Sequence, residues 1–124
     1  MISVVLLTVD CLRADHVGAY GYSRPTTPNI DKFVSEATKY TYSYSNCPGT
    51  RWAFQSLHTG VSTIRFNELG IPKNYKSLSR HFKQAGYATG GFAVNGYVSR
   101  DFNYDAGFDT YYSVKEATSK KNSI

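Results

Sequence analysis

Residues that could do ester chemistry are crowded into residues 46–60, "NCPGTRWAFQSLHTG". Cys47, Thr50 and Arg51 come just before, or at the start of, a run that predicts a helix. The start of a helix offers backbone N–H groups and the positive end of the helix dipole, which favour an alkoxide, a thiolate or a bound anion. The segment could therefore hold a nucleophile, or Thr50 could simply be the N-cap, a position that threonine often takes.

Asp10 is a second candidate, because it ends the apolar run "ISVVLLTVD" at residues 2–10. Such a run is typical of a parallel strand that is covered on both faces. Ligands of open α/β sheets gather at the carboxyl ends of the strands, where Asp10 would lie. A carboxylate there can ligate a divalent cation, or it can order the following loop without a metal.

Cys47 is the weaker candidate for a nucleophile. It precedes Pro48 and Gly49, which predict a turn, and no histidine stands close by in the sequence to act as its base. A free cysteine is usually a small buried hydrophobe. Cys11 and Cys47 form no CxxC pair, so they indicate neither a disulfide scaffold nor structural zinc, and reduced thiols favour a cytoplasmic protein.

Helices and strands are predicted to alternate along the chain. Helices are expected over residues 27–37, 50–59 and 75–85, and strands over residues 2–9, 40–44 and 87–94. This alternation predicts an α/β layered fold with a mostly parallel central sheet flanked by helices. The 124 residues suit one domain, which we expect over residues 1–112, followed by a polar tail over residues 113–124.

The bulk composition limits the partners. Net charge +5 favours anions, but the basic residues are scattered and match no nucleic-acid-binding motif, so we expect no specific nucleic acid. The uncharged part of the apolar run, residues 2–9, is eight residues long, which is too short for a transmembrane span, so we expect no membrane partner.

The stretch "VVLLTVDCLRADHVGAYGYSRPTTPNIDKF" resembles the N-terminal segment of the sulfatase branch of the alkaline phosphatase superfamily. Proteins of that family open with an apolar strand that ends in Asp, continue with D-x-L-R-x-D-x-x-x-x-Y-G-Y, and then carry T-P-N-[LI]-D at a helix. The later stretch "LSRHFKQAGYATGGFAVNGYVSRDFNYDAGFDTYY" is similar to the family's A-G-Y helix end, its G-F strand and its G-F-D segment. The resemblance covers residues 2–112 and implies the N-terminal part of an alkaline-phosphatase-like domain.

The resemblance implies that Thr50, rather than Cys47, is the nucleophile. In the family the nucleophile lies ten residues before the glycine of an L-x-T-G helix end, and counting back from Gly60 reaches Thr50. Relatives with an unmodified Ser or Thr at this position bind the metal through it. The resemblance therefore implies a catalytic Thr50 that shares a divalent metal (Zn, Mn, Mg or Ca) with Asp10.

The chain departs from the family directly after Thr50. Trp52 and Phe54 stand at +2 and +4, where the family usually has Pro and a basic residue. Formylglycine formation is therefore not expected, and Arg51 becomes the expected substrate-binding cation. The family's remaining metal ligands come from segments beyond the matched region, so we expect that this chain alone binds no metal stably.

Two functions follow from these observations. The first is the N-terminal portion of a sulfatase-like, metal-dependent hydrolase of sulfate or phosphate esters, inactive alone and completed by a C-terminal polypeptide. The second is a non-catalytic module on a degenerate sulfatase-like scaffold, which self-associates or binds a partner. Half of an α/β sheet would expose an edge and an apolar face, which favours such association.

Overall fold

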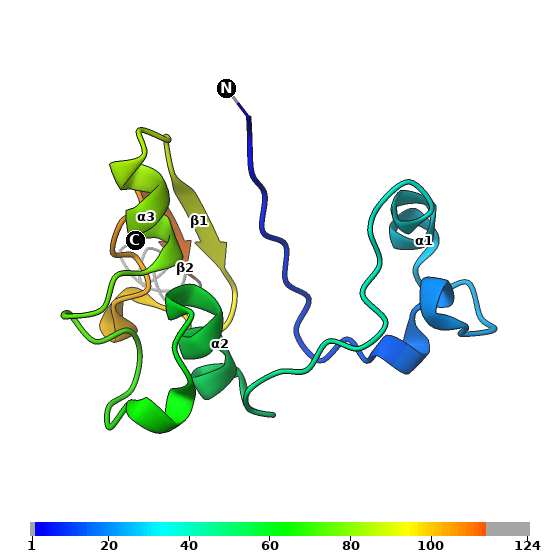
Figure 1. The fold of residues 1–124 in the computed structure, drawn as a ribbon, viewed down its shortest axis with the longest axis horizontal. Helices are drawn as coiled ribbons and strands as arrows, with labels where there is room; N and C mark the ends of the chain where they lie inside the picture. Colours follow the sequence, from blue (N-terminus) through cyan, green and yellow to red (C-terminus); the bar gives the residue numbers. More distant parts are fainter. Residues whose placement is uncertain (1, 114–124) are drawn as a thin grey trace, which may run out of the picture. The chain divides into compact units, whose positions relative to one another are not determined.

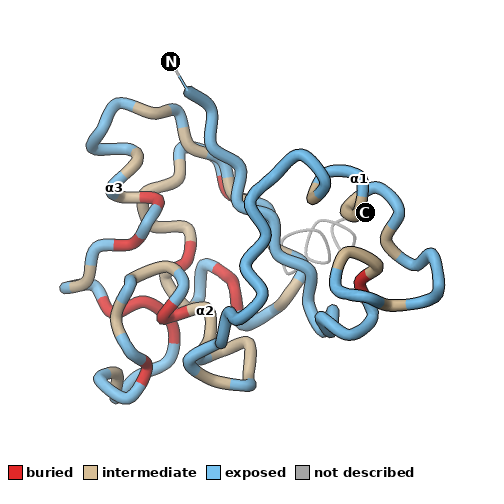
Figure 2. The backbone as a smooth tube through the Cα atoms, turned by 45° about the vertical axis from the view of Figure 1, so that its right-hand side comes forward, coloured by how far each residue is buried: buried red, intermediate tan, exposed pale blue. Residues whose placement is uncertain are grey.

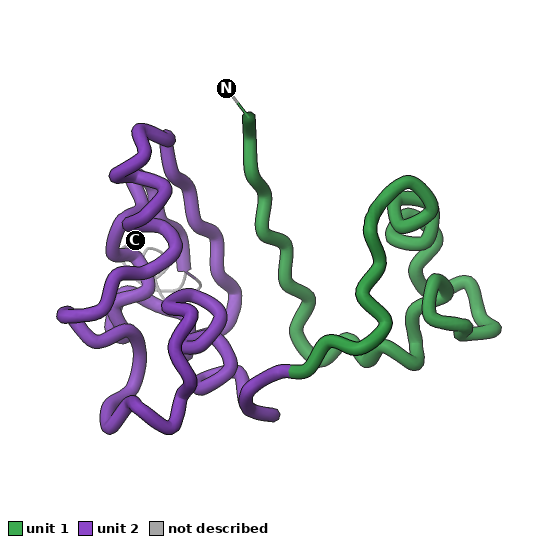
Figure 3. Tube along the Cα trace, in the orientation of Figure 1, with its two compact units in different colours: residues 1–44 green, residues 45–124 purple. Residues whose placement is uncertain are grey.

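The computed structural model describes residues 2–113 (Figure 1). The chain divides into two compact units, residues 1–44 and residues 45–124 (Figure 3). The one domain expected over residues 1–112 therefore stays a prediction.

The first unit is built from one short helix and two 3₁₀ turns. They are α1 (Pro28–Val34), η1 (Ala14–His16) and η2 (Gly18–Tyr20). Pro28 suits the first turn of α1, because its missing N–H has no partner to lose there. Val17, between the two turns, is the one buried residue among residues 2–44.

Polar side chains, rather than an apolar core, tie α1 to η2. The Thr27 hydroxyl accepts a hydrogen bond from the Gly18 N–H (3.0 Å) and donates one to Asp31 Oδ1 (3.0 Å). The same carboxylate oxygen accepts from the Ala19 N–H at 2.7 Å. A Cβ on Gly18 would meet the Asp31 carboxylate, so glycine is required where these two segments approach.

The second unit carries the longer elements and the only sheet among the described residues. They are α2 (Thr50–Thr59), η3 (Thr63–Arg65), α3 (Leu78–Gln84), β1 (Gly90–Ala93), η4 (Arg100–Phe102) and β2 (Thr110–Ser113). The two strands pair in parallel, with Gly90 opposite Thr110 and Ala93 opposite Ser113. A parallel pair beside helices confirms the predicted α/β class.

A small aromatic-rich core lies in this second unit. Its buried residues are Ile71, Val98, Tyr104 and Tyr111, with Phe54, Ala93, Phe102 and Phe108 packed against them. Figure 2 marks the buried positions in red. The hydroxyl of Tyr111 donates to the Val98 carbonyl at 2.8 Å, so the aromatic core is hydrogen-bonded as well as packed.

The predicted helix over residues 50–59 is confirmed, and Gly60 ends it in the left-handed conformation (φ 69°). The predicted helices over residues 27–37 and 75–85 are present but shorter, as α1 and α3. The predicted strand over residues 87–94 is confirmed in its second half as β1. β2 lies where the sequence predicts no strand.

The predicted strands over residues 2–9 and 40–44 are wrong. Neither segment forms a strand, and their side chains are exposed, with Val5 at 86% and Tyr44 at 85%. A strand needs a neighbouring backbone as well as a suitable pattern, and the described residues give residues 2–8 no backbone hydrogen bond. An apolar run thus has the composition of a strand, but it forms a strand only where a second strand pairs with it.

The predicted polar tail begins at Ser113, which closes β2, and residues 114–124 lie outside the described residues. Across residues 2–113 no helix has the length and apolar character needed to cross a bilayer.

Candidate functional site

Thr50 is the first residue of α2, and Gly49 precedes it as the N-cap. The Gly49 carbonyl accepts from the N–H groups of Trp52 (3.1 Å) and Ala53 (2.9 Å), which closes the first helical turn. The interpretation of Thr50 as the N-cap is therefore wrong. Its side chain instead lies at the amino end of the helix, where the helix dipole favours negative charge.

Arg51 and Trp52 form a stacked pair in the first turn of α2. The guanidinium carbon of Arg51 lies 4.8 Å from the centroid of the Trp52 ring, within the range of a cation–π interaction. The indole also lies against Gly49, where a Cβ would come within 2.9 Å of a ring carbon. Arg51 Nε is buried and has no hydrogen-bond partner among residues 2–113. The pair thus places a cation and an aromatic ring beside Thr50.

Gln55 fixes α2 to the rest of its unit. Its side chain is fully buried, and its amide nitrogen donates to the carbonyls of Glu68 (2.8 Å) and Gly70 (2.5 Å). Gly70 has φ 77°, and a Cβ there would meet the carbonyl oxygen of Phe102. One side chain thus links the helix to a turn that is itself packed against η4.

The carboxyl end of α2 is closed by local hydrogen bonds. The Thr59 hydroxyl donates to the Gln55 carbonyl at 2.6 Å and accepts from the Val61 N–H at 3.2 Å. The Gly60 N–H donates to the Ser56 carbonyl at 2.8 Å. These bonds satisfy helix-end groups that would otherwise lack partners, so the L-x-T-G sequence serves as a helix stop.

His58 packs into the aromatic core from α2. Its ring centroid lies 5.9 Å from that of Phe54 and 5.4 Å from that of Tyr104. Burial lowers the pKa of His58, and burial, with Tyr111 nearby, raises the pKa of the Tyr104 phenol. Both groups are therefore neutral at pH 7. This environment gives His58 a structural role as part of the core.

Asp10 lies in the first unit, in an exposed turn that follows the apolar run. The Cys11 thiol donates to Asp10 Oδ1 at 3.7 Å, a weak contact, and Cys11 has φ 57°. The predicted strand end is absent here, because residues 2–9 form no strand. The metal-ligating role of Asp10 stays a prediction.

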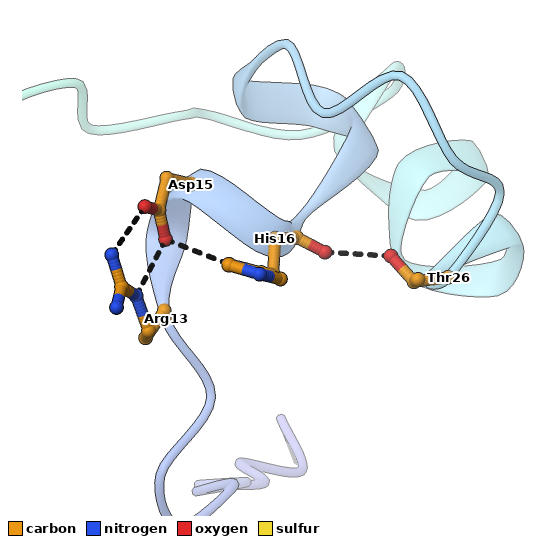
Figure 4. Close-up of polar contacts among 4 residues, drawn as sticks. All are labelled: Arg13, Asp15, His16 and Thr26. Carbon is orange, nitrogen blue, oxygen red and sulfur yellow. Dashed lines mark hydrogen bonds and ion pairs between the residues drawn. The ribbon is translucent and has the colours of Figure 1, made fainter.

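A polar cluster of Arg13, Asp15 and His16 follows Asp10 (Figure 4). Arg13 donates to both oxygens of Asp15, at 2.9 and 2.6 Å, and His16 Nδ1 lies 2.9 Å from Asp15 Oδ1. Hydrogen bonds, first from Arg13 and then from His16, hold the pKa of Asp15 well below its usual range. The Thr26 hydroxyl donates to the His16 carbonyl at 2.6 Å. These contacts order the loop before α1.

The described residues do not by themselves fit a divalent metal. Nowhere in residues 2–113 do three His, Cys, Asp or Glu side chains come close enough to hold an ion, whereas the ions named above take at least four ligands. Asp10 belongs to the first unit, and Thr50 and Arg51 to the second. Within the second unit, Thr50 and Arg51 are neighbours in the first turn of α2.

Sequence reasoning missed two features of the site. Gln55 belongs to no sequence motif. The one signal for its role is that a polar residue stands next to the apolar Phe54 in the helix. Trp52 departs from the family's pattern in sequence, but its stack with Arg51 depends on side-chain rotamers that residue spacing does not determine.

The known proteins that this chain is similar to are sulfatases. A family model described as Sulfatase matches residues 3–123. An arylsulfatase of Clostridium perfringens is 29% identical over 92 residues, which cover 70% of this chain and 19% of that protein. Human arylsulfatase D is 28% identical and covers 71% of this chain and 17% of its own length. An uncharacterised sulfatase of Escherichia coli, YidJ, is 25% identical over 97% of this chain and 27% of its own length.

The chain spans less than a third of the length of these curated relatives. No solved structure matches it significantly.

The buried His58 predicts a pH dependence of stability. Its folded-state pKa lies below its ordinary value of 6.5, so the unfolded chain binds a proton that the folded chain resists. The free energy of unfolding should therefore fall as pH drops from 7 to 5, by at most about 1.4 kcal/mol per pH unit from this residue. When the free energy of unfolding is measured with urea across this range, its dependence on pH should be weaker in His58→Phe than in the unchanged chain. The matched change at exposed His81, His81→Phe, should leave the slope unchanged, and equal slopes in all three chains would contradict the prediction.

Proposed function

This chain belongs to the sulfatase family, and from that premise we propose that it supplies the nucleophile helix of a hydrolase of sulfate or phosphate esters. The observation that carries the proposal is the position of Thr50. It begins α2, ten residues before the left-handed Gly60 that ends the helix. Arg51 beside it adds a cation at the same helix end. A nucleophile and an anion-binding group thus share one turn.

In the proposed reaction the Thr50 hydroxyl oxygen attacks the sulfur or phosphorus of the ester. The bond from that atom to the leaving oxygen breaks, and the threonine proton ends on the leaving alcohol. Water then cleaves the threonyl ester and releases sulfate or phosphate. The amino end of α2 and the Arg51 guanidinium favour the negative charge that builds on the transferred group.

The metal of this proposal needs ligands beyond the described residues. Asp10 would contribute one carboxylate and Thr50 one hydroxyl oxygen, which falls short of a full ligand set. We therefore derive no step through a metal. A polypeptide that carries the rest of the family's domain is the partner that this proposal requires.

A chimera tests the role of Thr50 directly. This chain would replace the matched part of the Clostridium perfringens arylsulfatase, and hydrolysis of p-nitrophenyl sulfate and p-nitrophenyl phosphate would be measured. Thr50→Val should lower kcat by about 10⁴-fold or more, because a nucleophile has no substitute, while Thr50→Ser should keep activity. Arg65→Gln, at an exposed arginine of the same unit, is the charge control.

Full activity of Thr50→Val in that chimera would overturn the proposal. The 124-residue chain alone, with Zn, Mn, Mg or Ca, is expected to give no appreciable turnover of either ester. Turnover by the chain alone that depends on Thr50 would overturn the requirement for a partner polypeptide.

One observation favours the second candidate, a module that associates without catalysis. Apolar side chains of residues 2–9 are exposed on both faces of the segment, from Leu6 at 52% to Val5 at 86%. The segment has no charge and no proline, and much of it is β-branched. This composition is typical of a strand that can pair with the edge of another chain. A second copy of this chain could supply that partner by edge pairing.

Light scattering tests this association. The chain should run above its monomer mass of 13.9 kDa, and the double change Val5→Lys with Leu7→Lys should return it to that mass, because charge opposes strand pairing. Ile64→Lys, at an equally exposed position of the second unit, should leave association intact. A monomeric unchanged chain would contradict this candidate.

A further inference from the structure

The surface around α3 carries cations that no carboxylate neutralises. Residues 69–100 contain no Asp or Glu, although five of them are Lys or Arg. Lys83 is paired with Asp109 at 2.8 Å. Arg100 is paired with Asp105 at 2.9 Å. The other three cations join no ion pair within the described part of the chain.

These three residues, Lys73, Lys76 and Arg80, form what we call the basic patch of α3. The Arg80 guanidinium donates to the Lys73 carbonyl at 3.4 Å. The Lys76 ammonium donates to Gln84 Oε1 at 3.3 Å. Arg80 and Gln84 are one helical turn apart, so residues 73–76 run along the side of α3 that both of them occupy. The basic patch therefore lies on one side of the helix.

The hydrogen bonds of the basic patch go to neutral acceptors, a backbone carbonyl and a side-chain amide. Both bonds are longer than the distance of about 2.7–3.2 Å that is usual between nitrogen and oxygen. Lys73 and Lys76 are exposed, and Arg80 is half-buried. An anionic group would form shorter, charge-assisted bonds with the same donors, so the patch is available to a negatively charged partner.

The segment that carries the basic patch is fixed to the rest of the second unit. The hydroxyls of Ser77 and Ser79 donate to the Ala106 carbonyl at 3.0 and 2.8 Å. Ser77 is fully buried and, as the N-cap of α3, accepts from the Arg80 N–H at 3.4 Å. A Cβ on Gly107 would meet the backbone of Arg80. A partner would therefore order little more than three side chains, which keeps the entropic cost of binding low.

The neighbours of the basic patch limit the kind of anion that it fits. The rings of Tyr75 and Phe82 are half-buried, and each lies edge-on to another ring, so they offer no stacking platform for a base or a sugar. Leu78 is the one large apolar side chain exposed within residues 73–84, and it lies two positions from Arg80 on a different side of α3. The patch therefore has no apolar group to enter a membrane surface.

We propose that the basic patch of α3 is an interaction surface for an acidic peptide segment of a partner protein. The Asp or Glu carboxylates of that segment would contact the three cations of the patch. Asn74 and Gln84 are exposed beside these cations, and their side-chain amides can bond the backbone of the segment. Recognition of acidic motifs by clustered cations is a recurring mode of peptide binding. The inference goes beyond the proposed function, because it does not depend on the amino end of α2.

Calorimetry on the full 124-residue chain tests the kind of partner. The chain would be titrated with hexaglutamate, and with an oligothymidylate and a heparin oligosaccharide of the same charge. Hexaglutamate should bind more tightly than the other two by about three- to tenfold, because the amides add hydrogen bonds to a peptide backbone. Added salt should weaken the binding, as expected for exposed ionic contacts.

Single changes locate the surface on the chain. Lys73→Gln, Lys76→Gln and Arg80→Gln should each weaken the binding of hexaglutamate by about two- to fivefold, as expected for the loss of one surface ion pair. Lys83→Gln is the matched control. It removes the same charge from the same helix, but from a lysine that is already paired with Asp109. This control should leave the affinity within about twofold of the unchanged chain.

Three results would overturn the inference. The first is a chain that does not bind hexaglutamate. The second is equal or tighter binding of the oligothymidylate or the heparin oligosaccharide, which would indicate charge attraction alone or a surface for nucleic acid or glycan. The third is a loss of affinity in Lys83→Gln as large as the loss in the three variants of the basic patch.

Discussion

The second unit depends on one buried side-chain amide. Gln55 donates both of its amide hydrogens to the carbonyls of Glu68 and Gly70, and no part of the residue is exposed. Gly70 is buried, so loss of the donor to its carbonyl would cost about 1–3 kcal/mol. The helix that begins with Thr50 is short, and isolated helices of this length are marginal in water. Its fixed position therefore comes from this anchor and from the contacts of Phe54 and His58 with the core.

The first unit is held together differently. Its apolar side chains are largely exposed. Hydrogen bonds tie its turns to one another: Thr27 and Lys39 donate them, and the Asp31 carboxylate accepts them. Surface ion pairs such as Arg13–Asp15 contribute little to stability. The order of these loops therefore comes mainly from hydrogen bonds between backbone groups and side chains. This construction gives the loop after Asp10 a defined shape without a core of its own.

Local signals in the sequence predicted the parts of the fold that are locally determined. Residues 50–59 predicted a helix, because helical spacing and a terminal glycine act within a few residues. Residues 2–9 and 40–44 have strand composition but form no strand, because pairing requires backbone from elsewhere. The family resemblance implies Thr50, rather than Cys47, as the nucleophile, and in the structure Thr50 begins the helix. The sequence did not predict the hydrogen bonds of Gln55 or the stack of Trp52 on Arg51. The first depend on residues distant in the sequence, and the second depends on side-chain rotamers.

Amide hydrogen exchange on α2 tests most directly the claim that Gln55 fixes the helix that presents Thr50. Gln55→Leu keeps the side-chain size and removes both donors, so protection of the α2 amides should fall by about tenfold or more, with smaller changes in β1 and β2. Gln84→Leu, at an exposed glutamine of α3, should leave α2 protection unchanged. Equal protection of α2 in Gln55→Leu and in the unchanged chain would contradict the account.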